Sequence, residues 1–484
     1  MTKPLALAIV LSVGTVLSAQ SAPDPMLARI RAEGQQHPQV APVFETLTAE
    51  IGPRLTNSPA FRRAADFARD RLAAAGLANV HEEPWHFGRG WTLEHLTVEM
   101  VEPRYMPLIG YAEAWSPSTA GDIVAAPVFI GGKTPDEVAA MRAELKGAIV
   151  MTQPMMTRFI RRDRPQPTDP NAPPSEPDAS AGTRPPASVQ QIAQIVREAG
   201  PAVAIRPSAG EHGTVFVTGR DGGPGAAPSV VLSGEHYNMI LRLLEHHVPV
   251  KLRVNVQAKY YDADENAVNV IGEIPGTDPA LEDQVVMIGA HIDSWHTGVG
   301  ATDNADGSTT VIEAMRILKA AGARPRRTIR VALWGGEEQG LLGSKAWVAE
   351  HLAGDANRAA RDAFDVYFNI DNGYGPIYGF YAEHNAGAKA LFDQWLAPFK
   401  DVGARENVID GIGATDHVTF NAAGLPGFNP IQSYQNYDIR THHTNMDTPE
   451  RLDEKDISQA AIVMASFAYH AATIDQKIPR AEER

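Results

Sequence analysis

The residues best suited to chemistry follow an apolar run near the middle of the chain. Residues 289–307 read GAHIDSWHTGVGATDNADG and hold two histidines, three aspartates and four glycines directly after the run QVVMI. A buried strand normally ends in turn residues, whereas this one ends in a row of metal-ligand types. We interpret His291, Asp293 and Asp303 as the first part of a metal site.

Two further predicted strands end in acidic residues. TIRVALWGGEE ends at Glu337 and Glu338, and DVYFNID ends at Asp371. The late segment THHTNMDT adds His442 and His443. Functional groups of open α/β sheets gather at the carboxyl ends of the strands, so we expect these side chains to converge. Several acids at one edge repel each other and lose hydration, which calls for a compensating cation.

Each of these residues also has a structural interpretation. Asp303 stands where a helix should begin and could be only an N-cap. A Glu-Glu pair at a strand-to-helix junction could simply favour the positive end of the helix dipole. His291 could be a core histidine. The convergence of all of them at one sheet edge favours the metal site.

The residue types indicate which cation is bound. Mixed imidazole and carboxylate ligands suit zinc, and the chain has no cysteine that could serve instead. There are enough ligands for two metals that share a carboxylate and clamp the attacking and leaving oxygens. Asp293 is placed to orient the imidazole of His291. Glu337 is placed to take a proton from a water activated by the metals.

Taken together, the motifs HIDS, TDNADG, GGEEQGLLGS, NID and HHTNMDT resemble metallopeptidase family 28 of clan MH. This family comprises the di-zinc aminopeptidases and their carboxypeptidase Q-like relatives. The resemblance implies that Asp303 bridges two zinc ions. It implies that His291 and Asp371 complete one zinc site, and that Glu338 and His443 complete the other. It also implies that Glu337 is the general base and Asp293 the partner of His291.

The segment GATDHVTFNAAGLPGF resembles the part of the family that lines the substrate pocket, with Asp416 and His417 matching. The best-known aminopeptidases carry a tyrosine four residues before that aspartate, where this chain has Ile412. Either another group polarises the scissile carbonyl, or the substrate class differs. The candidates for that group are Tyr434, Tyr437 and His442, and we count Tyr437 and His442 among the predicted substrate-binding residues.

The elements around these motifs predict the fold. From about residue 266, apolar strands alternate with helical patterns, which predicts a mixed, largely parallel sheet sandwiched by helices. From about residue 117, short β-type runs, GTVFVTG at 213–219 among them, predict an inserted small β-rich domain that resembles a protease-associated domain. The predicted catalytic domain therefore comprises residues 23–116 and 256–484, with the insert at 117–255. The proline-rich residues 162–186 predict an extended surface loop.

The N-terminal residues indicate the location of the protein, and the net charge limits the kinds of partner that it can bind. Residues 1–22 combine Lys3, an apolar run and small residues, as in a secretory signal peptide, which predicts a periplasmic or secreted protein with no membrane anchor after cleavage. A net charge of −15 disfavours nucleic acid as a partner. We expect a peptide or dipeptide substrate, and a homodimer is compatible with the sequence.

The sequence therefore predicts an exported di-zinc exopeptidase, an aminopeptidase in preference to a carboxypeptidase Q-like carboxypeptidase or dipeptidase. A single-zinc glutaminyl cyclase and a catalytically inactive binding protein are the remaining alternatives. HEEPWH at residues 81–86 is excluded as a helical zinc motif, because its histidines are five apart with a proline between them. The Gly-x-Ser-x-Gly signature of serine hydrolases does not occur.

Overall fold

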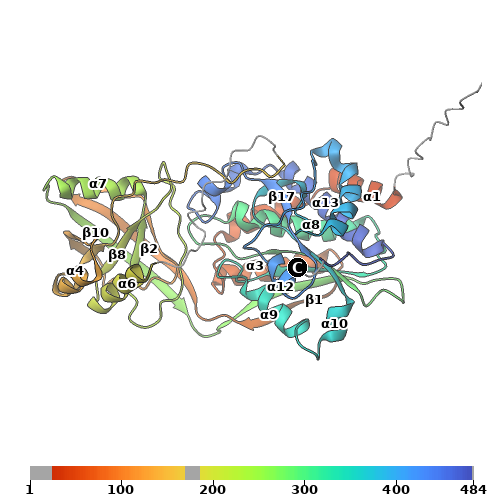
Figure 1. Ribbon diagram of the computed structural model, residues 1–484, viewed down its shortest axis with the longest axis horizontal. Coiled ribbons are helices and arrows are strands. Elements are labelled where there is room, and N and C mark those ends of the chain that lie inside the picture. The colour runs from red at the N-terminus through yellow and green to blue at the C-terminus, as the bar shows by residue number, and fades with distance from the viewer. Residues whose placement is uncertain (1–23, 169–185, 482–484) are drawn as a thin grey trace, which may run out of the picture.

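A computed structural model describes residues 24–168 and 186–481, which form two lobes (Figure 1). The larger lobe, to the right in Figure 1, is built on a six-stranded sheet with strand order β1-β11-β13-β12-β14-β16. The smaller lobe lies to the left. The predicted signal peptide at residues 1–22 lies outside the described residues, as do residues 169–185 of the predicted proline-rich loop.

The large sheet is mixed, with its central strands parallel. Its strands are β1 (Ala78–His86), β11 (Asn266–Ile274), β13 (Thr328–Trp334), β12 (Val285–His291), β14 (Phe364–Asn369) and β16 (Gly427–Phe428). β12 lies between β13 and β14 and runs parallel to both, and β16 is parallel to β14. β11 is antiparallel to β13, and β1 is antiparallel to β11. The predicted mixed, largely parallel sheet is thereby confirmed.

Helices cover both faces of this sheet, because alternate residues of each strand point to opposite sides. In β12, Ile288 packs into one core and Met287 into the other. The helices that contribute to the Ile288 core are α1 (Pro25–Gln36), α2 (Val40–Glu45), α3 (Pro59–Ala74), α8 (Asp306–Ala320), α11 (Ala386–Leu396) and α13 (Glu454–Thr473). Those that contribute to the Met287 core are α9 (Leu342–His351) and α12 (His417–Ala422), with α10 (Arg358–Ala363) following α9. The sandwich predicted from the alternation of strands and helices is therefore present.

Helix starts in this lobe are set by local side chains and by burial. Ser58 caps α3, because its Oγ accepts the backbone N–H of Phe61 at 3.2 Å. α8 is buried over most of its length and packs along α13. The loop directly before α8 is therefore anchored to the core. Within residues 24–168 and 186–481, no helix is both long and apolar enough to span a bilayer.

The smaller lobe contains two sheets, and its hydrophobic cores are separate from those of the larger lobe. One sheet has the order β3-β2-β10-β5, with β3 (Met106–Pro107), β2 (Gly90–Glu102), β10 (Lys251–Tyr261) and β5 (Ile123–Ala125). The other has the order β4-β9-β8-β7-β6, with β4 (Gly110–Ala112), β9 (Ser229–Leu232), β8 (Val203–Pro207), β7 (Ile149–Met151) and β6 (Pro127–Phe129). The helices of the smaller lobe are α4 (Pro135–Ala140), α5 (Arg142–Leu145), α6 (Ala187–Ala199) and α7 (Gly234–Glu245).

The pairing of β2 with β10 sets the extent of this lobe. The two strands pair along nearly their whole length, from Gly90 opposite Tyr261 to Glu102 opposite Lys251. The lobe therefore begins before residue 117 and ends after residue 255, the boundaries predicted from composition. Composition could not locate these ends, because the pairing joins segments about 150 residues apart, as between Glu102 and Lys251. The likeness to a protease-associated domain stays a prediction.

Residues 213–219, predicted as a β-type run, do not form a strand. They make isolated bridges, one of them between Phe216 and Thr444, and the N–H of Val217 donates to the carbonyl of His443 at 3.0 Å. Their backbone partners thus lie partly in a loop of the larger lobe. The remaining elements are the strand pair β15 (Tyr374–Phe380) and β17 (Pro430–Ser433) and the short helical turns η1 (Thr46–Ile51), η2 (Ala301–Ala305), η3 (Ala397–Val402), η4 (Tyr437–Thr441) and η5 (Pro449–Arg451).

Candidate metal centre

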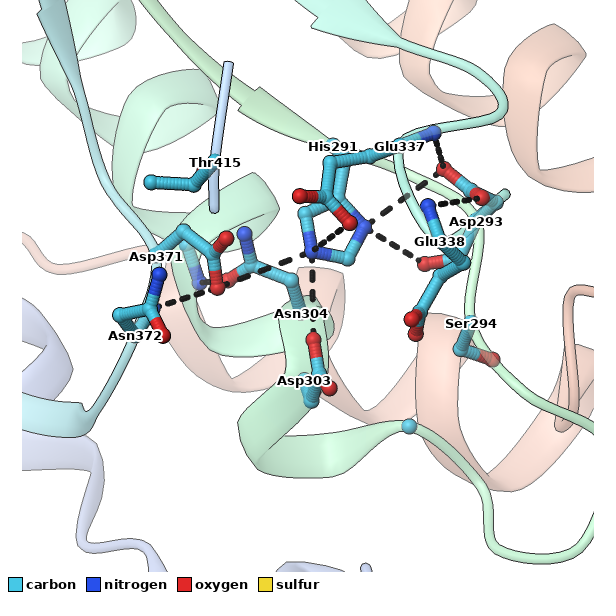
Figure 2. Close-up of polar contacts among 12 residues, drawn as sticks. His291, Asp293, Ser294, Asp303, Asn304, Glu337, Glu338, Asp371, Asn372 and Thr415 are labelled. Carbon is cyan, nitrogen blue, oxygen red and sulfur yellow. Dashed lines mark hydrogen bonds and ion pairs between the residues drawn. The ribbon is translucent and has the colours of Figure 1, made fainter. Parts of the chain in front are cut away.

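Three parallel strands end at one edge of the larger sheet, and predicted ligands lie at or just beyond their ends (Figure 2). His291 is the last residue of β12, Asp371 closely follows β14, and Glu337 and Glu338 lie in the turn after β13. Because the carboxyl ends of parallel strands share an edge, these segments meet. Asp303 enters from η2, directly before α8.

His291 faces two carboxylates. Its Nε2 lies 3.2 Å from Oδ1 of Asp303 and 3.7 Å from Oδ1 of Asp371. All three side chains are buried, and their donor atoms lie within 4.8 Å of one another. One imidazole and two carboxylates at this spacing form a donor set that zinc accepts.

A second imidazole faces the other oxygen of Asp303. Nε2 of His443 lies 3.4 Å from Oδ2 of Asp303 and 3.0 Å from Oε2 of Glu338. The donor atoms of Asp303, His442 and His443 also lie within 4.8 Å of one another. Asp303 thus presents one oxygen to His291 and the other to His443, the arrangement of a carboxylate placed between two cations.

The carboxylates of the centre are crowded and shielded from water. Burial raises the pKa of Glu338 to about 7, and the neighbouring Asp303 raises it as well. Burial also raises the pKa of Asp447 to about 7, again helped by Asp303. A carboxylate that loses hydration beside another carboxylate favours its neutral form.

The same acidic side chains raise the pKa values of His291 and His443. Burial by itself lowers the pKa of His443, but Glu338 and Asp303 outweigh it and raise the value to about 9. Burial likewise opposes the charged form of His291, yet Glu337, Asp293 and the other acids raise its pKa well above the usual range. The centre therefore attracts positive charge.

The space and the free donor atoms fit a small cation. A cavity of about 10 Å³ is lined by Asp303, Glu338 and His443, among others, which is the volume that one water-sized species occupies. Among the described residues, Oε1 of Glu338 is buried without a hydrogen-bond partner, and Nε2 of His291 and Oε2 of Glu338 have only the ion-pair contacts given above. Buried polar atoms are normally satisfied, so these atoms point to a metal ligand role.

Glu337 also points into the centre. Its Oε2 lies 3.9 Å from Nε2 of His291. Burial raises the pKa of Glu337 well above its usual range; His291 opposes this rise and Asp371 adds to it. A raised pKa suits a carboxylate that takes up and returns a proton near neutral pH.

Asp293 supports the turn that carries both glutamates. Its carboxylate accepts the backbone N–H groups of Glu337 and Glu338, each at 3.3 Å, and the hydroxyl of Thr56 at 2.8 Å (Figure 2 shows the two backbone contacts). The Nδ1 of His291 lies 3.0 Å from the backbone carbonyl of Asp293 and 3.5 Å from its carboxylate. The contact with His291 is therefore shared between backbone and side chain, and the carboxylate also fixes the turn.

Asp447 positions the loop that carries Asp303, a role that the sequence reasoning did not assign. Its carboxylate accepts the backbone N–H of Thr302 at 2.7 Å and that of Asp303 at 3.2 Å. The loop of Asp303 is thereby held from the segment that also carries His443. Its place within the motif THHTNMDT was the signal that could have revealed it.

Arg54 was missed as well, and it lies beneath the centre. It is fully buried and donates to the backbone carbonyls of Ile292 at 2.8 Å, Val299 at 2.7 Å and Gly300 at 2.8 Å. Burial lowers the pKa of Arg54 to about 10, while Asp447 and the other acids oppose that change. Arg54 lies in a Gly-Pro loop without periodic pattern, so the sequence offered no signal for it.

The four residues predicted to bind substrate differ in accessibility. Asp416 and His417 are 0% exposed, and Nε2 of His417 lies 3.3 Å from Oε1 of Glu383. Asp416 also lies close enough to Glu337 to raise the pKa of that glutamate, and the binding of substrate by Asp416 and His417 stays a prediction. Tyr437 is also fully buried, whereas His442 is partly exposed. His442 is therefore the accessible member of this set.

Comparisons with known proteins agree with the resemblance seen in the motifs. The family profile described as Peptidase family M28 matches residues 269–468. Carboxypeptidase Q of Homo sapiens is 25% identical over 450 residues, which cover 93% of this chain and 88% of that protein. The structure of a peptidase M28 precursor from Shewanella amazonensis SB2B has a TM-score of 0.72 at 24% identity, covering 94% of this chain and 98% of that one. BSAP, a zinc aminopeptidase from Bacillus subtilis, has a TM-score of 0.60 at 19% identity, covering 90% and 95%. The two structural likenesses show the fold, and the matched range includes the five predicted ligands.

Proposed function

We propose that this chain, whose residues 269–468 match the profile of Peptidase family M28, is an exported exopeptidase that uses two zinc ions to cleave short peptides. The observation that carries this proposal is the placement of Asp303, with one oxygen toward His291 and the other toward His443. Two zinc ions at these positions would polarise the scissile carbonyl and lower the pKa of a water molecule.

The ligand assignment follows from the two donor groups. His291, Asp303 and Asp371 would hold one ion, and Asp303, Glu338 and His443 would hold the other. Mixed nitrogen and oxygen donors favour zinc over magnesium or calcium, which prefer oxygen ligands throughout. The zinc named for the aminopeptidase BSAP supports the same choice.

Glu337 acts as the general base and then as the general acid. Its carboxylate accepts a proton from the attacking water as the new C–O bond forms. It then donates that proton to the amide nitrogen as the C–N bond breaks, so the amine leaves neutral. Its position 3.9 Å from His291 and its raised pKa support this assignment.

His442 is the side chain that we assign to the carbonyl oxygen, in the place of the tyrosine that Ile412 replaces. Tyr434 is already engaged, because its hydroxyl lies 2.8 Å from that of Tyr381. Tyr437 is fully buried, with its ring stacked against His442 at a centroid distance of 5.0 Å. The partly exposed His442 has a ring nitrogen within 4.8 Å of the donor atoms of Asp303 and His443.

The terminus from which the enzyme cleaves is the finer question. The sequence favoured an aminopeptidase, but a relative that aligns along 93% of this chain is named carboxypeptidase Q. We therefore place carboxypeptidase or dipeptidase activity first. Aminopeptidase activity is the second candidate, since the zinc aminopeptidase BSAP shares this fold.

A set of four dipeptides tests the reaction and its direction. We expect the purified protein with zinc to hydrolyse free Ala-Leu and N-acetyl-Ala-Leu, and to leave Ala-Leu-amide intact. Cleavage of the amide but not the acetyl peptide would establish the aminopeptidase instead, and cleavage of free Ala-Leu alone would establish a strict dipeptidase. The doubly blocked peptide serves as the control for endopeptidase activity.

The same assay tests the two assigned side chains. Glu337→Gln should lower kcat by about 10³-fold or more, because general acid–base catalysis contributes about 10²–10⁴-fold. Zinc content, measured by mass spectrometry, should stay at two ions per chain. His442→Phe should also lower kcat and keep both ions. A variant that retains full activity would remove that residue from the mechanism.

Export is proposed on the residues at positions 1–22. N-terminal sequencing of the protein recovered from culture fractions tests it. A mature N-terminus near residue 20–23 in the periplasm or medium is expected, and an intact Met1 in the cytoplasmic fraction would overturn it.

A further inference from the structure

The segment that carries His443 is held in place by the smaller lobe. The N–H of Val217 donates to the carbonyl of His443 at 3.0 Å, and the N–H of Val215 donates to Oδ1 of Asn445 at 2.7 Å. Both donors belong to the irregular run 213–219 of the smaller lobe. The His443 loop is thus hydrogen-bonded across the lobe boundary on its far side.

Residues 163–166 follow β7 of the smaller lobe and form hydrogen bonds with the turn that precedes His443. We call these residues the strap. The carboxylate of Asp163 accepts the backbone N–H groups of Asn436 at 2.7 Å and Ile439 at 3.1 Å. These two groups flank the start of η4, the helical turn that leads to His442 and His443. The strap therefore fixes the backbone of η4 directly.

Arg164 makes the most extensive contacts of the strap. Its guanidinium forms a fork on Asp438, with Nη2 donating to Oδ1 at 2.6 Å and Nε donating to Oδ2 at 3.0 Å. Its backbone N–H donates to Oδ2 of Asp438 at 2.7 Å, and its Nη1 donates to Oδ1 of Asn372 at 3.1 Å. A two-pronged pair of this kind fixes orientation as well as distance.

The same guanidinium begins a stack that ends at the metal centre. It lies 5.6 Å from the ring centroid of Tyr437. The ring of Tyr437 stacks on His442 at 5.0 Å, and His442 lies 3.8 Å from the ring of His443. Tyr437 is fully buried, so a shift of Arg164 changes the packing of a side chain that has little free space.

We propose that Arg164 is a positioning residue through which the smaller lobe sets the half of the metal centre formed by Glu338 and His443. This inference rests on the two-zinc site proposed above. The smaller lobe is then part of the enzyme's metal-binding apparatus, and not only a surface insertion. Arg164 acts through Asp438 and the stacked rings.

Zinc binding to the full chain tests the proposal, measured by competition with a chromophoric chelator. Wild type should bind two ions. Arg164→Ala should keep one ion at wild-type affinity and bind the other about 10–100-fold more weakly, the usual effect of losing a residue that orients a ligand. Arg164→Lys should give an intermediate loss, because an ammonium keeps the charge but cannot form the fork or stack in the same way.

Arg142→Ala is the matched control. Arg142 lies in α5 of the same lobe, pairs with Glu198 at 2.9 Å and is 48% exposed. The Arg142→Ala variant should bind both zinc ions as wild type does. If Arg164→Ala does not fold, Asp438→Ala removes the acceptor of the fork and should weaken binding of the same ion.

The outcomes separate this inference from the proposed function. Wild type with two ions, and Arg164→Ala also with two at unchanged affinity, would overturn the role of Arg164 alone. Equal weakening of both ions together with a lower Tm would also overturn it, because that is the signature of general destabilisation. Wild type with fewer than two ions after zinc supplementation would overturn the proposed function itself.

Discussion

His291 and Asp371 enter the metal centre from the ends of adjacent strands, whereas Glu338 and His443 enter it from a turn and a loop. The side chain of His291 is 1% exposed and that of His443 is 24% exposed. His443 also has a backbone φ of 60°, a left-handed conformation that costs a residue with a Cβ atom about 1–2 kcal/mol. Neighbouring contacts must hold it there.

This difference shows that one site can rely on two kinds of support. The sheet half, His291 and Asp371, is positioned by the hydrophobic core beneath the strands, and groups on strands are placed more precisely than groups on loops. The loop half, Glu338 and His443, is positioned by the Asp293 carboxylate and by hydrogen bonds from the smaller lobe. Asp303 joins the two halves.

Removing the shared carboxylate should have the largest effect. Asp303→Ala should lose both zinc ions and lower activity by more than about 10⁴-fold, since it removes metal activation on top of the 10²–10⁴-fold that a general base contributes. The measurement is metal content by mass spectrometry beside the dipeptide assay. Retention of both ions would refute the bridging role.

Removing one histidine from each half should separate the two kinds of support. His291→Ala and His443→Ala should each retain about one zinc ion, because each site needs about three protein ligands. His291→Ala should also lower unfolding stability by about 1–3 kcal/mol, because it disrupts a buried network. The more exposed His443→Ala should change it by less than about 0.5 kcal/mol. Thermal unfolding of the metal-free proteins measures this difference. Equal losses of unfolding stability in the two variants would contradict the idea that the two halves are supported differently.

Replacing Asp447, the residue that orients Asp303, should have the smallest effect and should weaken zinc binding at both halves alike. Asp447→Ala removes the acceptor for the N–H groups of Thr302 and Asp303, and should lower zinc affinity about 10–100-fold. Chelator competition should show both ions weakened to a similar degree, unlike Arg164→Ala. Asp453→Ala, which removes the N-cap of α13 away from the centre, is the control and should leave zinc affinity unchanged.

The ligand types and the parallel sheet were readable from the sequence because both depend on local order. Strands rich in β-branched residues, each followed by acids or histidine, define which side chains stand at strand ends, and parallel strands bring those ends to one edge. His291, Glu337, Glu338 and Asp371 therefore meet as expected. The adjacent helices were readable for the same reason, from spacing and caps.

Other features depend on contacts between distant segments, and only the tertiary structure decided them. Which oxygen of Asp303 faces which histidine follows from how η2 is held by Asp447, 144 residues further along the chain. The burial of Asp416 and His417 follows from packing that no motif records. Arg54 and Arg164 stand in loops without periodicity, and their roles come from partners 238 and 274 residues away. Local sequence determines which groups can act as ligands, whereas long-range packing determines where each of them points.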